Sequence, residues 1–211
     1  MPTAQCVRIA EVSCSVNNRI FTDPTLLPDV LGGVLVHAPE EPAGSPLFPA
    51  AVLLPLHFED NEWKLLFTRR TEHLNHHRGQ VSFPGGGIEP CETSLQAALR
   101  EVMEEIGIAA EDIRILGRLP VLVTLTNFHI TPHVGIVRWP LPLTVNPDEV
   151  VRVFSVPLSW LAQPGNHRME LYKGPSQYPP HVLPFFEPYD QEVIWGATAM
   201  LVKRLLKQID K

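Results

Sequence analysis

The sequence predicts an α/β protein in which helices cover the faces of a mixed β-sheet. Apolar runs of strand length are interspersed with two or three helical segments and do not alternate strictly with them. The 22 prolines among 211 residues are about twice the usual share of ~5%, which argues against a helical bundle. A hydrophobic content of 45% with 19% charged residues is ordinary for a globular chain and excludes disorder, collagen and coiled coil.

The chain divides into an N-terminal part, residues 1–46, and a domain, residues 47–211. The first part has an irregular pattern and ends in a turn-rich stretch with several prolines, so we expect an extension and a connector. In the domain, apolar runs at 50–56 and 63–68 flank the polar turn Glu59-Asp60-Asn61-Glu62. Two such runs around a polar turn predict a β-hairpin.

Residues 93–106 have the periodicity of an amphipathic helix, and Gly107 stands where a C-terminal stop belongs. The segment near 165–190 is rich in Pro, Tyr and His and has no clear period, which predicts an irregular insert. Residues 192–208 form a second amphipathic pattern. The remaining expected elements are strands at 113–116, 130–139 and 150–154 and a short helix at 158–162.

Charge and targeting signals restrict the classes of partner. A formal charge of −6 gives no general attraction for a polyanion, so we expect no nucleic-acid partner. No apolar run reaches the ~18 residues of a membrane span, and the first residues lack the regions of a signal peptide. Three cysteines without Cys-x-x-Cys spacing suit a reducing compartment. We therefore expect a cytoplasmic protein without a membrane partner, and the sequence leaves homodimerisation open.

Three glutamates share one edge of the helix at 93–106. At about 100° per residue, Glu101, Glu104 and Glu105 lie nearly opposite the apolar stripe, on what we expect to be an exposed edge. No Lys or Arg is interleaved there to offset their repulsion. Carboxylate oxygens are ligands of hard divalent cations such as Mg²⁺. The edge is interpreted either as a partial metal cage or as a solvated acidic helix face.

The residues before this helix add a glycine-rich loop. The run Ser82-Phe83-Pro84-Gly85-Gly86-Gly87 would let the backbone approach a ligand, although such turns also occur for structural reasons alone. Arg100 is expected to pair with Glu92 and so to pin the loop to the helix. The alternative for this pair is an ordinary surface contact.

Together these residues resemble a complete Nudix box, the pattern G-x5-E-x7-R-E-U-x-E-E-x-G-U in which U is apolar. The pattern runs without a gap over the 23 residues from Gly86 to Ile108. The resemblance implies a Nudix fold, an α/β/α sandwich around a mixed sheet, and hydrolysis of a nucleoside diphosphate linked to another group with Mg²⁺ or Mn²⁺. The roles that it implies are metal ligation by Glu101 and Glu105, further ligation or proton acceptance by Glu104, and bracing of the loop by Gly86, Glu92 and Arg100.

The segment just upstream, residues 65–86, resembles the signature L-L-T-x-R-[SA]-x3-R-x3-G-x3-F-P-G-G of the coenzyme A pyrophosphatase group. The matching positions are Thr68, Arg70, Gly79, Phe83, Pro84, Gly85 and Gly86. Thr71 stands where Ser or Ala is usual, and Asn75 stands where the second Arg is usual. The cations left to face substrate phosphates are Arg69, Arg70 and Arg78, with His73, His76 and His77.

This second resemblance implies that coenzyme A (CoA) or acyl-CoA is cleaved to adenosine 3′,5′-bisphosphate and (acyl-)4′-phosphopantetheine. Glu104 and Glu149 are candidates for the base that accepts the proton of the attacking water, and Glu149 is otherwise a turn carboxylate before a strand. Aromatic residues of the insert line an adenine or pantetheine pocket, or pack under the loop; they are Tyr172, Tyr178, Phe185, Phe186 and Tyr189. The alternative functions are hydrolysis of ADP-ribose, NADH or a damaged nucleotide, and nucleotide binding without catalysis.

Overall fold

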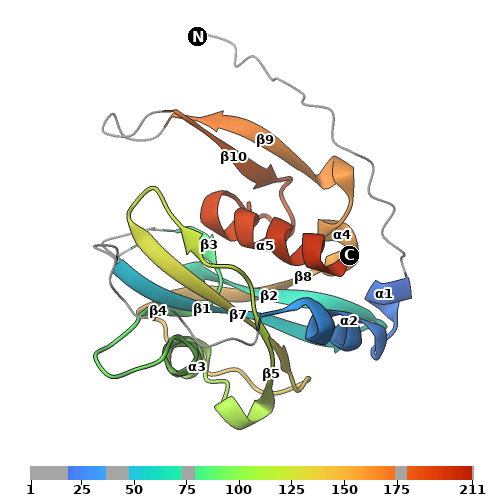
Figure 1. Cartoon of the computed structure of the whole chain (residues 1–211), viewed down its shortest axis with the longest axis horizontal. Helices are drawn as coiled ribbons and strands as arrows, with labels where there is room; N and C mark the ends of the chain where they lie inside the picture. The colour runs from blue at the N-terminus through green and yellow to red at the C-terminus, as the bar shows by residue number, and fades with distance from the viewer. Residues whose placement is uncertain (1–18, 37–47, 73–78, 174–179, 211) are drawn as a thin grey trace.

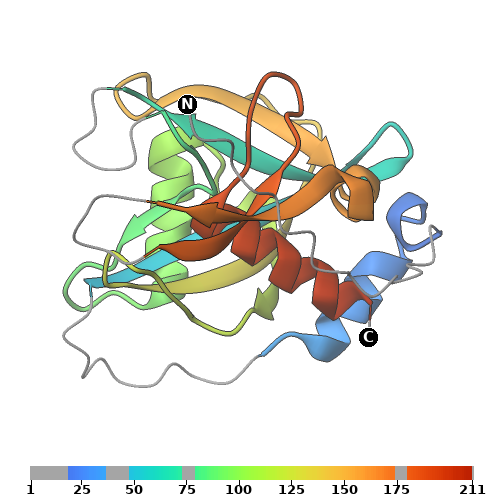
Figure 2. The ribbon, with the colours of Figure 1, turned by 90° about the horizontal axis from the view of Figure 1, so that it is seen from above.

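The computed structural model describes residues 19–36, 48–72, 79–173 and 180–210. A mixed sheet forms its centre, with helix α3 (Ser94–Ile106) on one face and helix α5 (Gly196–Ile209) on the other (Figure 1). Seen from above, α5 crosses the sheet on the side opposite to α3 (Figure 2). These three layers confirm the predicted α/β class and the α/β/α sandwich.

The predicted strands and the short helix are present, with bounds that differ by a few residues. The strands of the sheet are β1 (Phe48–Glu59), β2 (Glu62–Arg70), β3 (Val81–Ser82), β4 (Gly85–Gly87), β5 (Ile113–Arg118), β6 (Leu122–Val123), β7 (Phe128–Val137) and β8 (Val150–Pro157). A short 3-10 turn, η1 (Ala110–Asp112), precedes β5, and helix α4 (Leu158–Leu161) follows β8.

The sheet has the order β3-β2-β1-β7-β5, with β4 on β1, β6 on β7 and β8 on β2. Strands β1 and β7 are parallel, and the other pairs are antiparallel. The register of β1 with β2 covers only Leu56 to Glu59, because the start of β1 pairs with β4 and the end of β2 pairs with β3. The segment 81–87 therefore lies in the opening between β1 and β2, which brings the glycine loop into the middle of the sheet.

Successive residues of a strand point to opposite faces of a sheet, and both faces are covered. On one face, Leu53 and Leu66 pack with Val102 and Ile106 of α3. The core on the other face contains residues of β1, β2 and α5, among them Leu54, Phe67, Val202 and Leu205. Thr93 caps α3 with a capping box, and Gly107 ends it with φ 73°, as the sequence predicted for this glycine.

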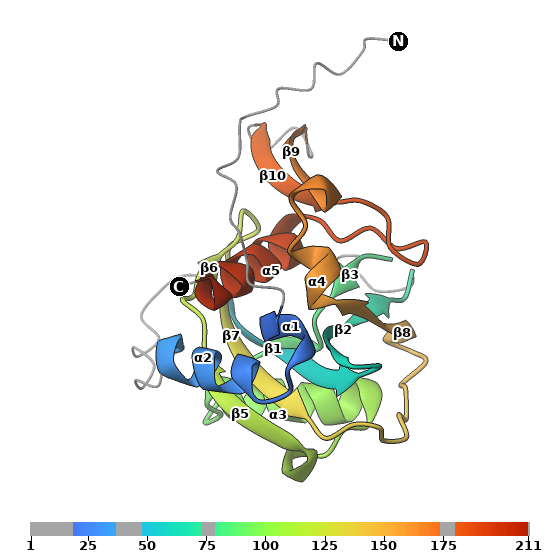
Figure 3. The same ribbon diagram turned by 90° about the vertical axis from the view of Figure 1, so that its right-hand side faces the viewer.

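The expectation of irregular structure before residue 46 is wrong for residues 19–34. They form helices α1 (Arg19–Thr22) and α2 (Leu26–Val34), and α2 lies beside α5 and β5 (Figure 3). Phe21, Leu27 and Leu31 are buried in the same core as α5. Proline and glycine are poor helix formers, and α2 contains Pro28 and two glycines. The helix propensity of this segment therefore did not predict α2.

The insert near 165–190 is also more regular than predicted. The turn η2 (Pro164–Asn166) leads into a hairpin of β9 (His167–Tyr172) and β10 (His181–Phe186), which lies above α5 in Figure 1. Helix α5 begins at Gly196 rather than at 192. In the part of the chain that the structure describes, no helix has the length and apolarity needed to cross a membrane.

Candidate active site

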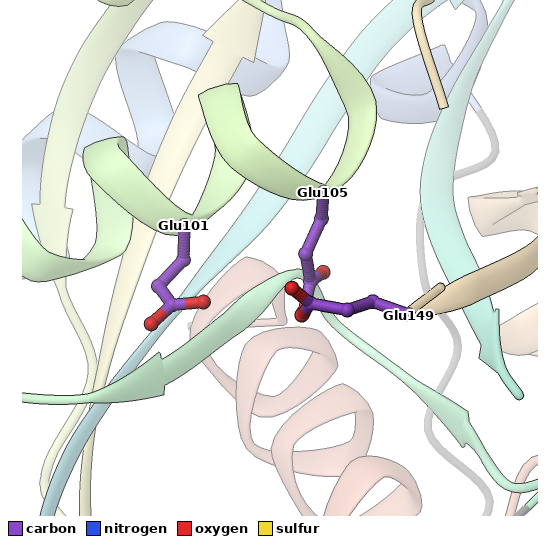
Figure 4. A group of neighbouring side chains, drawn as sticks. All are labelled: Glu101, Glu105 and Glu149. Carbon is purple, nitrogen blue, oxygen red and sulfur yellow. The ribbon is translucent and has the colours of Figure 1, made fainter. Parts of the chain in front are cut away.

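Three carboxylates from two distant parts of the chain converge at the C-terminal half of α3. Glu101 and Glu105 are one helical turn apart and point the same way, and Glu149 reaches them from the loop before β8 (Figure 4). Oxygen atoms of the three side chains lie within 4.8 Å of one another. Glu104 is not part of this group.

The loop that carries Glu149 is fixed to both neighbouring elements. The backbone N–H of Asn146 donates to the carbonyl oxygen of Glu105 at 2.9 Å, and that of Thr71 donates to the carbonyl oxygen of Glu149 at 2.9 Å. The Asn146 side-chain amide also donates to Glu149 Oε1 at 3.3 Å. These bonds tie the third carboxylate to the end of α3 and to the end of β2.

Glu105 is buried, so the expectation of an exposed edge is wrong for this residue. Its exposed fraction is 0%, and its Oε2 atom has no hydrogen-bond partner. Arg70 Nη1 donates to Oε1 at 3.3 Å. Burial raises the pKa of Glu105 to about 8 against the opposing effect of Arg70, and burial also raises the pKa of Glu101. Helix periodicity could not predict this, because the loop of Glu149 and the glycine strand supply the cover.

Two glycines of the loop, Gly85 and Gly86, have no room for a side chain. A Cβ atom on Gly86 would lie 2.3 Å from Glu101 Oε1, and one on Gly85 would lie 2.3 Å from the carbonyl oxygen of Ala51. The backbone of Gly85 lowers the pKa of Glu105, against the larger effect of burial. Residue 86 therefore has to be glycine for Glu101 to hold its place.

Arg100 connects the loop to the helix. It donates to both oxygens of Glu92, at 2.9 and 3.1 Å, so the pairing predicted from the sequence is present. It also donates to the carbonyl oxygen of Gly87 at 3.1 Å and to Glu101 and Glu104 at 2.9 Å each. The hydrogen bonds from Arg100 lower the pKa of Glu92. Glu104 is largely exposed, with its carboxylate on Arg100 rather than on the other glutamates.

Two of the arginines predicted to face substrate phosphates, Arg69 and Arg70, have different partners. Arg70 contacts Glu105, whereas Arg69 pairs with Glu192 at 3.1 Å, because neighbouring residues of a strand point to opposite faces. Arg78 lies outside the described residues, as do Asn75 and His73, His76 and His77. The contact between Arg70 and Glu105 had no signal in the sequence beyond the signature position of Arg70.

The aromatic residues of the insert are divided among different surroundings. Phe186 is buried in the core, and Tyr189 contacts Trp160 with ring centroids 4.9 Å apart. Tyr172 and Phe185 contact Trp195, with centroids at 5.2 and 5.4 Å. Tyr178 lies outside the described residues. Phe186 therefore packs in the core, which is the alternative to a pocket that the sequence left open for these residues.

Comparisons with known proteins agree with the geometry. The NUDIX domain family matches residues 47–173, which is more than half of the chain. An uncharacterized Nudix hydrolase, NudL, from Escherichia coli O7:K1 is 36% identical over 162 residues, which cover 76% of this chain and 82% of that protein. NudL from Yersinia pestis is also 36% identical and is covered to 79%.

A solved structure of a MutT/nudix family protein from Enterococcus faecalis has the same fold, with a TM-score of 0.54 and 16% identity over 96% of this chain and 76% of that one. The family match covers more than half of the chain, the relatives align over most of their own length, and the three carboxylates converge on one site. The chain belongs to the Nudix hydrolase family, whose enzymes act on phosphoric anhydrides.

Proposed function

We propose that this enzyme is a Mg²⁺- or Mn²⁺-dependent hydrolase of the diphosphate bond of CoA or acyl-CoA. The products are adenosine 3′,5′-bisphosphate and (acyl-)4′-phosphopantetheine. The observation that carries the hydrolytic part is the convergence of Glu101, Glu105 and Glu149 within 4.8 Å. The CoA part rests on the signature upstream of the box.

The chemistry of the three side chains fits a divalent cation. All their donor atoms are carboxylate oxygens, which hard cations such as Mg²⁺ and Mn²⁺ prefer. Glu105 Oε2 is buried without a hydrogen-bond partner, and a buried carboxylate oxygen left unsatisfied is costly. Glu101, Glu105 and Glu149 would hold the ion, which when bound supplies positive charge to the diphosphate and lowers the pKa of water.

The chain's own residues position and neutralise the substrate. Arg70 puts a fixed positive charge beside Glu105, where a diphosphate oxygen of the substrate would lie. The glycine loop lets the substrate approach the backbone. Glu104 and Glu149 are the proposed proton acceptors: Glu149 lies among the carboxylates, and Glu104 is one residue from Glu105 and exposed.

A product analysis tests the proposal. The purified protein with Mg²⁺ or Mn²⁺ is incubated in parallel with CoA, acetyl-CoA, NADH, ADP-ribose and 8-oxo-dGTP, and the products are identified by chromatography and mass. A Glu105→Gln protein, purified in the same way, controls for contaminating hydrolases.

We expect adenosine 3′,5′-bisphosphate from CoA or acetyl-CoA at a kcat/KM well above that for the other compounds. If ADP-ribose, NADH or 8-oxo-dGTP is hydrolysed preferentially, that compound replaces CoA as the proposed substrate. The difference would then be attributed to Asn75, which stands where the signature has an Arg. No turnover of any compound, with nucleotide binding retained, would support a binding domain instead.

A further inference from the structure

A groove runs between the C-terminal end of α3 and the loop that leads to Glu149. Its volume is about 410 Å³, within the 300–1,000 Å³ that is usual for small-molecule sites. The lining residues are Met103, Glu104, Gly107, Thr144, Val145, Asn146 and Pro147. Glu101 and Glu105 are not among these lining residues.

The groove borders the carboxylate group. Glu104 precedes Glu105 in α3, and Asn146 holds Glu149 through its side-chain amide at 3.3 Å. The walls are packed closely, because a Cβ atom on Gly107 would lie 2.7 Å from Cβ of Thr144. The backbone N–H of Thr144 also donates to the carbonyl oxygen of Ile106 at 3.1 Å. The groove therefore lies beside the two elements that carry the carboxylates, helix α3 and the loop of Glu149.

The lining selects against phosphate. Its one charged member among the described residues is Glu104, which repels an anion, and no lining residue is basic. Met103, Val145 and Pro147 supply apolar surface, and Met103 is 54% exposed. The hydroxyl of Thr144 and the amide of Asn146 can hydrogen-bond neutral polar groups. The only basic side chain that touches the carboxylate group from β2 is Arg70, which is not part of the groove.

From this charge pattern we infer that the groove binds the neutral pantetheine arm of the substrate and not the phosphorylated adenosine. The arm has two amides and a branched hydrocarbon segment, and these match the mixture of apolar and hydrogen-bonding surface. The inference deepens the proposed function and rests on it for the identity of the substrate.

Binding of the two products, measured by calorimetry, tests the assignment. Met103→Trp and Thr144→Trp fill the groove from its two walls at exposed positions, so the fold should tolerate them. Leu171→Trp, at a 59% exposed site on the β9–β10 hairpin, is the matched control. We expect each groove variant to weaken 4′-phosphopantetheine about tenfold, equal to about 1.4 kcal/mol. Adenosine 3′,5′-bisphosphate should bind all the proteins within about twofold, as expected for surface changes outside its site.

Several outcomes would overturn the groove assignment. These are unchanged 4′-phosphopantetheine binding in both groove variants, equal weakening of the bisphosphate, or no binding of 4′-phosphopantetheine to the unmodified protein. CoA hydrolysis is measured on the same samples. If the unmodified protein does not cleave CoA but binds 4′-phosphopantetheine in a groove-dependent way, the proposed function fails and the groove assignment stands. If CoA is cleaved with unchanged KM in both groove variants, the groove assignment alone fails.

Discussion

The α3 face of the sheet buries an acid at one end and a base at the other, and the two are stabilised differently. Glu105 and His57 both have an exposed fraction of 0%, and each has one buried polar atom without a partner. Glu105 lies by the glycine loop. His57 lies six residues along β1 from Ala51, the residue that pairs with Gly86.

The surroundings of the two groups have opposite consequences. His57 accepts or donates one hydrogen bond with Ser155 at 2.7 Å and contacts the ring of Trp139 in a tilted arrangement, with ring centroids 4.3 Å apart. Burial lowers its pKa to about 4, so it is neutral at neutral pH and needs no counter-charge. Glu105 faces two further carboxylates. A buried base kept neutral serves the fold, whereas Glu105, whose pKa burial raises to about 8, can exchange its proton for a cation held jointly with the neighbouring carboxylates.

The largest expected effect is that of Glu105→Gln. Because the variant removes a charge that would hold the metal, we expect kcat/KM to fall by roughly 10³-fold, the equivalent of several kcal/mol of lost charge stabilisation. In metal-free buffer at neutral pH its Tm should equal or exceed that of the unmodified protein, because burial raises the pKa of Glu105 to about 8, so Glu105 must take up a proton on folding and Gln need not. Calorimetric melting with and without MgCl₂ measures the Tm of both proteins.

In that experiment the unmodified protein should gain Tm on addition of Mg²⁺, because an ion that binds only the native state stabilises it. The Glu105→Gln protein should gain little. An equal gain in both proteins would contradict the assignment of Glu105 as a metal ligand.

Gly86→Ala should have the next largest effect. The new methyl group would occupy the position of the Glu101 carboxylate, which is the flexible end of a side chain and moves away at low cost. We therefore expect a folded protein with metal affinity and activity lowered by roughly 10–100-fold, as for other disturbances around metal ligands. Titration with Mn²⁺, followed by electron paramagnetic resonance, measures the affinity.

Gly87→Ala is the matched control, since no atom lies within 4 Å of a Cβ atom built there. Metal affinity that fell equally in both variants would show that the loop, rather than the position of Glu101, is responsible.

Arg70→Ala should have a smaller effect. Loss of its fixed charge beside Glu105 should raise KM for CoA by about tenfold, within the usual range for a residue that supports a metal ligand. Arg69→Ala is the control, because Arg69 pairs with Glu192 on the other side of β2. The Arg69 change should alter Tm more than KM. The same KM for both variants would remove Arg70 from the phosphate site.

The sequence predicted the helix of the box correctly because both its periodicity and its ends are local features. Thr93 and Gly107 mark the two ends, and Arg100 meets Glu92 over a short separation. It could not predict that Glu105 is buried, since the cover comes from Glu149, 44 residues later in the numbering. It also missed α2, where Pro28 obscures a helix that packing stabilises. Features that depend on contacts between segments distant in the sequence could not be predicted.

The smallest expected effect concerns His57 and acid stability. Its pKa is about 4 in the folded protein and about 6.5 in the unfolded chain, so the unfolded state binds more protons below pH 6.5. The stability from neutral His57 is fully present above about pH 6.5 and is lost as the pH falls toward 4; by pH 5 the loss is roughly 1–2 kcal/mol. Urea unfolding at pH 7 and pH 5 measures it.

His57→Gln keeps a polar side chain but does not titrate, so the difference in unfolding free energy between pH 7 and pH 5 should shrink by that amount. His133, buried and paired with Ser94 at 2.7 Å, has a pKa lowered to about 4 for the same reason and should contribute independently. His133→Gln in the His57→Gln background should therefore flatten the pH dependence further. An unchanged slope in the double variant would mean that neither histidine is held neutral by burial, and the contrast with Glu105 would then fail.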